Sequence, residues 1–168
     1  LGLPSYRAAF EGVQMMVWPG EPPVPDPERS RVMASRLVES LADGRAAVVQ
    51  TALGARPRFA LEATGPESRV VPSGGVALAG EGPWVLRAEL PEPGPWEARL
   101  LRDGQPVAAA RETPLRFAAD EPGTYRVVVE RLRDPAPPPG SPPWILSNPI
   151  YVWPSPVVVA SRIQRVPA

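Results

Sequence analysis

Residues 143–153 read PWILSNPIYVW, two short apolar runs with Ser-Asn-Pro between them. Short runs rich in Ile, Val and aromatic residues, broken by turn residues, are typical of β-strands. Pro149 lacks the N–H that a sheet ladder needs, and Asn148 tolerates unusual backbone dihedrals. We therefore interpret Ser147-Asn148-Pro149 as a built-in bulge that re-registers one final strand on its way across a sheet.

Further upstream, between residues 58 and 130, apolar residues alternate with polar ones at period two, which indicates half-buried strands. Turn residues separate these runs, and Asp103-Gly104 is a strong hairpin dipeptide. Many short strands with regular turns predict a β-sandwich or barrel. The residues predicted to face inward are Phe59, Leu61, Ala63, Trp84, Leu86, Ala88, Leu90, Trp96, Ala98, Leu100, Leu115, Phe117, Ala119, Tyr125, Val127 and Val129.

The stretch 120–129, DEPGTYRVVV, resembles the corner that leads into a late strand of immunoglobulin-like folds. In such a corner a Tyr hydroxyl bonds back to the preceding loop. Tyr125 is either this corner residue or an ordinary core tyrosine, and the sequence leaves both interpretations open.

The first third of the chain has a different pattern. Val13–Trp18 and Ala46–Leu53 are apolar enough for strands, and the segment between them carries the signals of a helix. Asp26 is a good N-cap, Pro27 suits the first helical position, and Asp43-Gly44 is a good stop. The apolar face of this helix recurs every three to four residues and comprises Met33, Ala34, Leu37, Val38 and Leu41.

Composition narrows the chemistry that the chain can carry. The 168 residues contain 18 acidic and 18 basic side chains, every basic one an Arg, and neither Cys nor His. Thiolate and imidazole catalysis, disulfides and imidazole metal ligands are therefore excluded. The balanced charge shows no basic stripe for nucleic acid, and no stretch reaches the ~18 apolar residues of a membrane span.

No catalytic motif remains among the other residue types. Ser73-Gly74-Gly75 is better explained as a turn than as a nucleophile elbow. Two acidic pairs, Glu89 with Glu92 and Asp120 with Glu121, lie in turn-like segments, where solvated carboxylates are expected. We predict no catalytic, metal-binding or cofactor-binding residue, and no enzymatic activity for this chain alone.

Six segments in a fixed order resemble a known family. They are LPSYRAAF, a helix ending in ADGRAAVV, VPSGGVALAG, RLLRDGQPVAAA, LRFAADEPGTYRVVVE and PWILSNPIYV. Over roughly residues 3–152 this order is similar to the C-terminal region of PHP-family metallohydrolases, in the carbaryl-hydrolase-like branch. The resemblance implies that the metal-binding His and Asp residues lie in an upstream catalytic domain, which would bind a divalent metal.

The resemblance also implies a division of the chain. Residues 1–54 would be the strand–helix–strand end of the catalytic domain, and residues 55–168 an immunoglobulin-like antiparallel β-sandwich with a proline-rich loop at 133–143. The expected fold class is mainly β. Because Leu1 is not an initiator residue, we expect the chain to be a piece of a longer polypeptide.

The favoured hypothesis is a non-catalytic module that packs on the upstream catalytic domain of a phosphoesterase or esterase. The alternatives are an independent carbohydrate- or protein-binding sandwich and a structural domain of a secreted bacterial protein. The compartment, cytoplasmic or secreted, is left open. The candidate residues for a domain interface are Trp18, Trp144, Asn148, Tyr151 and Trp153.

Overall fold

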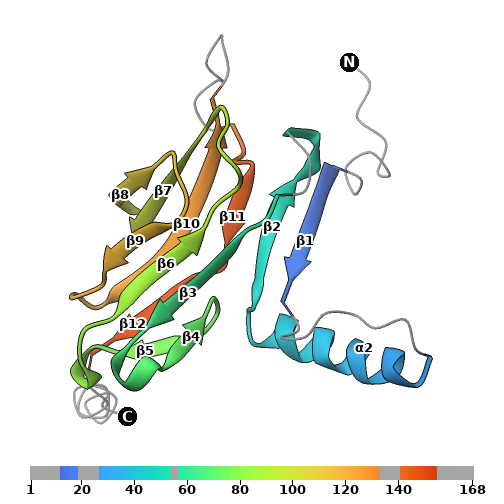
Figure 1. The fold of residues 1–168 in the computed structure, drawn as a ribbon, viewed down its shortest axis with the longest axis horizontal. Helices are drawn as coiled ribbons and strands as arrows, with labels where there is room; N and C mark the ends of the chain where they lie inside the picture. Colours follow the sequence, from blue (N-terminus) through green and yellow to red (C-terminus); the bar gives the residue numbers. More distant parts are fainter. Residues whose placement is uncertain (1–11, 19–26, 54–56, 133–140, 155–168) are drawn as a thin grey trace, which may run out of the picture.

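A computed structural model describes residues 12–18, 27–53, 57–132 and 141–154, with residues 27–30 described by their backbone. Several predicted features lie outside these residues: the N-cap Asp26, the resemblance segment LPSYRAAF and most of the proline-rich loop. The described residues form a mainly β fold of two packed sheets, as the sequence predicts (Figure 1).

The larger sheet has the strand order β1-β2-β11-β10-β12-β5, and β7 with β8 continues it from the other side of β10. The smaller sheet has the order β4-β3-β6-β9. All pairs are antiparallel except β12 with β5. The strands are β1 Val13–Val17, β2 Ala46–Gln50, β3 Ala60–Thr64, β4 Val70–Pro72, β5 Val76–Leu78, β6 Val85–Glu89, β7 Trp96–Arg102, β8 Gln105–Ala110, β9 Leu115–Ala118, β10 Gly123–Arg131, β11 Ile145–Ser147 and β12 Ile150–Trp153.

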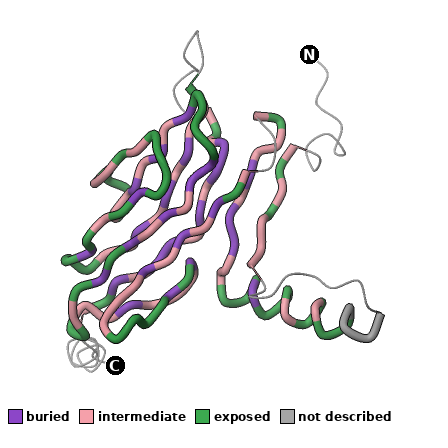
Figure 2. Tube along the Cα trace, viewed as in Figure 1, coloured by how far each residue is buried: buried purple, intermediate pink, exposed green. Residues whose placement is uncertain are grey.

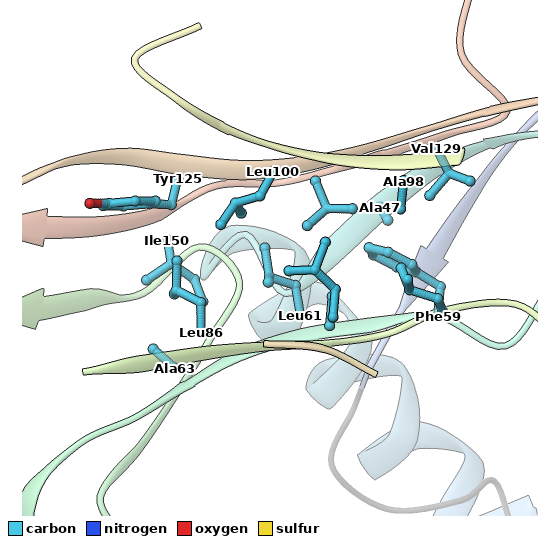
Figure 3. Packing of buried hydrophobic residues seen from close by; sticks show 14 of the residues in the cluster. Ala47, Phe59, Leu61, Ala63, Leu86, Ala98, Leu100, Tyr125, Val129 and Ile150 are labelled. Atoms are coloured by element: carbon cyan, nitrogen blue, oxygen red, sulfur yellow. The ribbon is translucent and has the colours of Figure 1, made fainter. Parts of the chain in front are cut away.

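The core lies between the two sheets, and the period-two pattern predicts it well. Figure 3 shows inward side chains of the larger sheet, such as Leu100 and Val129, facing those of the smaller sheet, such as Leu61. Every residue predicted to face inward is buried except Phe117, which is half-buried and packs against the core. Because successive strand residues point to opposite faces, the alternation alone separates core from surface.

The bulge predicted at Ser147-Asn148-Pro149 is confirmed. Strand β10 pairs with β11 at Val128↔Leu146 and with β12 at Tyr125↔Ile150, so its partner has one more residue over the same span. The interruption also changes the outer neighbour: β11 pairs with β2, whereas β12 pairs with β5. The bulge therefore lets one segment join two otherwise separate parts of the sheet.

A buried serine replaces the ladder hydrogen bond that the bulge removes. The N–H of Val127 donates to Oγ of Ser147 at 2.9 Å, and Ser147 is buried. Ser40 on the helix is also buried, but its Oγ has no hydrogen-bond partner among the described residues. The two serines therefore form a matched pair for mutagenesis.

We expect Ser147→Ala to lower the free energy of unfolding by about 1–3 kcal/mol, because it leaves the buried Val127 N–H unsatisfied. We expect Ser40→Ala to be neutral or stabilising by up to about 1 kcal/mol, because it removes an unpaired buried hydroxyl from a helix. Urea denaturation of both variants checks this. Equal losses of stability in the two variants would show that the Ser147 hydrogen bond contributes no more to stability than the Ser40 hydroxyl does.

The helix α2 spans Pro27–Ala42 and ends as predicted, with Gly44 in the left-handed region at φ 71°. The predicted strand at 46–53 is shorter than expected: β2 ends at Gln50, and Thr51–Leu53 form the 3-10 helix η1. Its neighbours explain this, because pairing with β1 stops at Gln50 and pairing with β11 stops at Val49. The other 3-10 helices are η2, Pro66–Ser68, and η3, Ala79–Glu81.

Strand β2 belongs to the same sheet as the sandwich strands. It pairs with β11 on one side and β1 on the other, and Ala47 and Val49 join the common core. The sequence places a boundary near residue 54, and residues 54–56 lie outside the described part of the chain. The division into 1–54 and 55–168 stays a prediction. The backbone pairing of β2 with β11 joins residues from the two sides of this boundary.

Candidate interaction surface

Strand β1 and helix α2 carry apolar side chains that no described residue covers. We call these side chains the apolar corner; they are Val13, Met15, Leu37, Val38 and Leu41. Their exposed fractions run from 37% for Leu37 to 66% for Val38. Side chains of this kind are normally buried on folding. Their burial stabilises the folded state by about 25 cal/mol per Å² of apolar area removed from water. A run of them on two adjoining elements indicates a surface that another molecule or domain covers.

The exposure follows from which side of α2 meets the sheet. The helix lies across the end of β1 and β2 and extends past β1 (Figure 1). Ser40 is completely buried, whereas Leu37 and Leu41 on the predicted apolar face are exposed. Figure 2 shows α2 mostly in the green and pink of exposed and intermediate residues. The predicted face is thus present, but the described part of the chain leaves much of it uncovered.

Strand β1 is an edge of the larger sheet: its only pairing in the described part of the chain is with β2. The N–H of Trp18 donates to the C=O of Arg45 at 3.1 Å, which sets the direction of the alternating backbone groups. Along an antiparallel strand, alternate residues point their N–H and C=O toward the same neighbour. Val13, Met15 and Val17 therefore direct their backbone groups away from β2.

Two of the predicted interface residues make their contacts inside the chain. Trp144 is 3% exposed, and the guanidinium of Arg131 lies 3.8 Å from its ring centroid. Asn148 donates from Nδ2 to the C=O of Gly44 at 3.0 Å, and its N–H donates to the C=O of Ala46. Both side chains thus have a structural role, and their part in a domain interface stays a prediction.

The other three candidates lie at two separate places. Trp18 is half-buried at the end of β1, with its ring centroid 6.3 Å from that of Phe59. Tyr151 and Trp153 point to the same outer side of β12, with ring centroids 6.4 Å apart and planes tilted by 60°. Trp153 is 45% exposed. The structure therefore brings Tyr151 and Trp153 together and leaves Trp18 near the apolar corner.

Sequence reasoning missed a junction of three turns at the end of α2. Gly74 N–H donates to the C=O of Pro149 at 2.7 Å, and a Cβ on Gly74 would lie 2.0 Å from the backbone oxygen of Asp43. A shallow depression of about 360 Å³ lies beside this junction. Among the residues that line it, Arg45 pairs with Asp43 at 2.9 Å, which leaves little net charge for a ligand. The junction therefore fastens α2 to the sandwich.

Tyr125 makes the hydrogen bond expected of a tyrosine corner: its hydroxyl donates to the C=O of Glu121 at 2.7 Å. Burial raises the pKa of Tyr125 above the ordinary tyrosine value, against an opposing hydrogen bond from Arg102. The folded state therefore favours the neutral phenol. The contribution of Tyr125 to the free energy of unfolding is present below about pH 10 and is lost as the pH rises further. The chain has no Lys and no Cys, the other side chain types whose ordinary pKa lies in the alkaline range.

We expect Tyr125→Phe to cost about 0.5–1.5 kcal/mol at pH 7, and this cost to shrink above about pH 10. Urea denaturation of both proteins at pH 7 and at about pH 10.5 measures the two differences. A cost that stays constant or grows over this interval would contradict the assigned direction of the pKa.

The described residues hold no cluster of three or more His, Cys, Asp or Glu side chains suited to a metal ion. Within the same residues, no helix is long and apolar enough to cross a membrane. Comparison with protein families, with characterised proteins and with solved structures gives no match. The apolar corner and the Tyr151–Trp153 pair are thus the surfaces from which function has to be argued.

Proposed function

We propose that this chain is a non-catalytic C-terminal module of a PHP-like, metal-dependent phosphoesterase or esterase, and that it packs on the upstream catalytic domain. The observation that carries the proposal is the apolar corner. Helix α2 shows exposed Leu37, Val38 and Leu41 over a segment with clear helix start and stop signals. A helix of this kind usually turns its apolar face to a protein core.

The location of the corner agrees with the same proposal. It lies on β1 and α2, in the segment that the family resemblance assigns to the end of a catalytic domain. The divalent metal and its ligands would belong to that domain, because the present chain has neither His nor Cys. The role of the module would be to cover or position the catalytic domain. We also propose that the sandwich is immunoglobulin-like. The hydrogen bond of Tyr125, which is the one expected of a tyrosine corner, supports this part of the proposal.

Expression of the longer polypeptide and of the 168-residue chain tests the proposal. We expect the longer protein to bind a divalent metal and to hydrolyse model phosphoesters or carboxyl esters, and the shorter chain to do neither. Hydrolysis by the purified 168-residue chain would contradict the proposal, as would an upstream sequence that lacks clustered His and Asp.

The pair Tyr151 and Trp153 favours one other function, an independent carbohydrate-binding module. Both rings lie on the outer side of β12, and Trp153 is 45% exposed. Aromatic rings that bind sugars offer exposed apolar faces to the ligand. Glycan-array binding by the isolated chain, lost in Trp153→Ala and kept in Leu37→Ser, would favour this function over the first.

A further inference from the structure

Within the described part of the chain, the outer edge of β1 has no charge, proline or bulge of the kind that usually protects an edge strand. Natural edges carry charges, prolines or bulges that prevent another strand from pairing. The sequence of β1 is VQMMV, and it pairs with β2 at five successive positions without a shift in register. In the other sheet, the edge strand β4 is only three residues long and ends in Pro72.

Hydrogen bonding on β1 defines what can occupy this edge. The backbone groups of Val13, Met15 and Val17 point outward, and no described strand pairs with them. An extended strand satisfies such a row at its own spacing, whereas a helix has already used its backbone groups. Val13 and Met15 are exposed on one side of β1, so a paired strand would place its own apolar side chains beside them.

The surroundings of this edge indicate that the strand that pairs with β1 belongs to a folded domain. Helix α2 reaches past β1 on the open side, so a strand beside β1 would also lie near α2 (Figure 1). The exposed Leu37 and Leu41 of that helix require an apolar partner surface. A free peptide beside β1 would leave this helix face in water, whereas a domain that contributes a strand would cover both.

We infer that β1 is an acceptor strand, and that a strand of the upstream catalytic domain continues the larger sheet beside it. This inference rests on the proposed function and adds the mode of docking. In the proposed function the upstream domain belongs to the same polypeptide as β1, so it would be covalently tethered to the module that carries this edge. Such a covalent connection raises the effective concentration of the domain at β1, which favours it over a second copy of the chain.

Hydrogen exchange resolved to single amides tests the inference in the longer polypeptide and in the 168-residue chain. In both proteins we expect the amides of Gln14 and Met16, which point to β2, to be protected. The amides of Val13, Met15 and Val17 should exchange freely in the shorter chain and become protected in the longer one. This alternation along one strand is specific to edge pairing, because general shielding would protect all five amides.

A charged substitution provides a matched control. We expect Met15→Lys in the longer polypeptide to lower the protection of Val13 and Val17 by roughly tenfold or more, because Lys discourages pairing at an edge. Val70→Lys, at an exposed valine on the edge strand β4, should leave that protection unchanged. An equal effect of the two substitutions would overturn the inference.

The other outcomes separate this inference from the proposed function. If the methyl groups of Leu37 and Leu41 become shielded in the longer protein while the Val13, Met15 and Val17 amides stay free, the edge inference fails and docking through α2 stands. If neither changes, the docking part of the proposal fails as well. Protection in the 168-residue chain that rises with its concentration would identify a second copy as the occupant and overturn the inference.

Discussion

Replacing Gly74 with Ala is expected to destabilise the protein by roughly 3–5 kcal/mol. A Cβ at this position would lie 2.0 Å from the backbone oxygen of Asp43 and 2.6 Å from the carbonyl carbon of Gly44. Both contacts are with backbone, so no side chain can rotate away. Gly74 also has φ 87°, a conformation that L-residues adopt only with strain. The variant should therefore separate the turn after β4 from the end of α2.

Gly104→Ala is the matched control for this prediction. Gly104 has a similar φ of 84°, but a Cβ there would meet nothing within 4 Å. We expect Gly104→Ala to lower the free energy of unfolding by about 1–2 kcal/mol, because only the strain of the left-handed backbone conformation contributes. Chemical denaturation of the two variants measures the difference, which isolates the packing of the turn junction. Equal costs would show that Gly74 is needed only for its dihedral angles.

The second large effect is expected for Trp84→Ala, at about 3–5 kcal/mol. Trp84 is completely buried immediately before β6, and its Nε1 donates to the C=O of Leu78 at 2.9 Å. Gly65 lies so close to the indole that a Cβ there would be 2.6 Å from a ring carbon. Truncation therefore removes apolar burial, leaves a cavity and breaks a hydrogen bond.

Trp153→Ala serves as the comparison, because Trp153 is 45% exposed. We expect its free energy of unfolding to change by no more than about 0.5–1 kcal/mol. Thermal and urea unfolding of both variants would establish the ranking. A large loss for Trp153→Ala would mean that the outer side of β12 is packed against residues outside the described part of the chain.

Local patterns explain why the strands and the helix could be predicted from the sequence. In β6, Leu86 and Ala88 are buried and the intervening Arg87 is half-buried, as period two requires. Helix α2 ends at an Asp-Gly stop, and the Ser-Asn-Pro break produces the bulge between β11 and β12. Each of these features depends on residues within a few positions of one another.

Contacts between distant segments could not be predicted in this way. The parallel pairing of β5 with β12 joins Val76 to Tyr151, and the turn junction joins Gly44 to Gly74. No periodicity encodes such pairings, because they depend on the assembled fold. Among the candidate interface residues, Trp144 is buried, and the guanidinium of the distant Arg131 lies over its ring.

The apolar corner could be predicted from the sequence only in part. The helix face formed by Leu37, Val38 and Leu41 is evident in the sequence, and its exposure is evident only in the structure. The sequence marks Val13–Trp18 as an apolar strand, but it does not show that β1 is a sheet edge. Apolar patterning shows that a face will be covered, whereas topology shows whether the chain itself covers it.

Calorimetric unfolding of the longer polypeptide, with and without Leu37→Ser and Leu41→Ser together, tests docking through the apolar corner most directly. Because both residues are exposed, the double variant should change the stability of the 168-residue chain by no more than about 0.5–1 kcal/mol. In the longer protein, we expect it to split one cooperative transition into separate transitions of module and catalytic domain. An unchanged single transition in the longer protein would contradict docking through this surface.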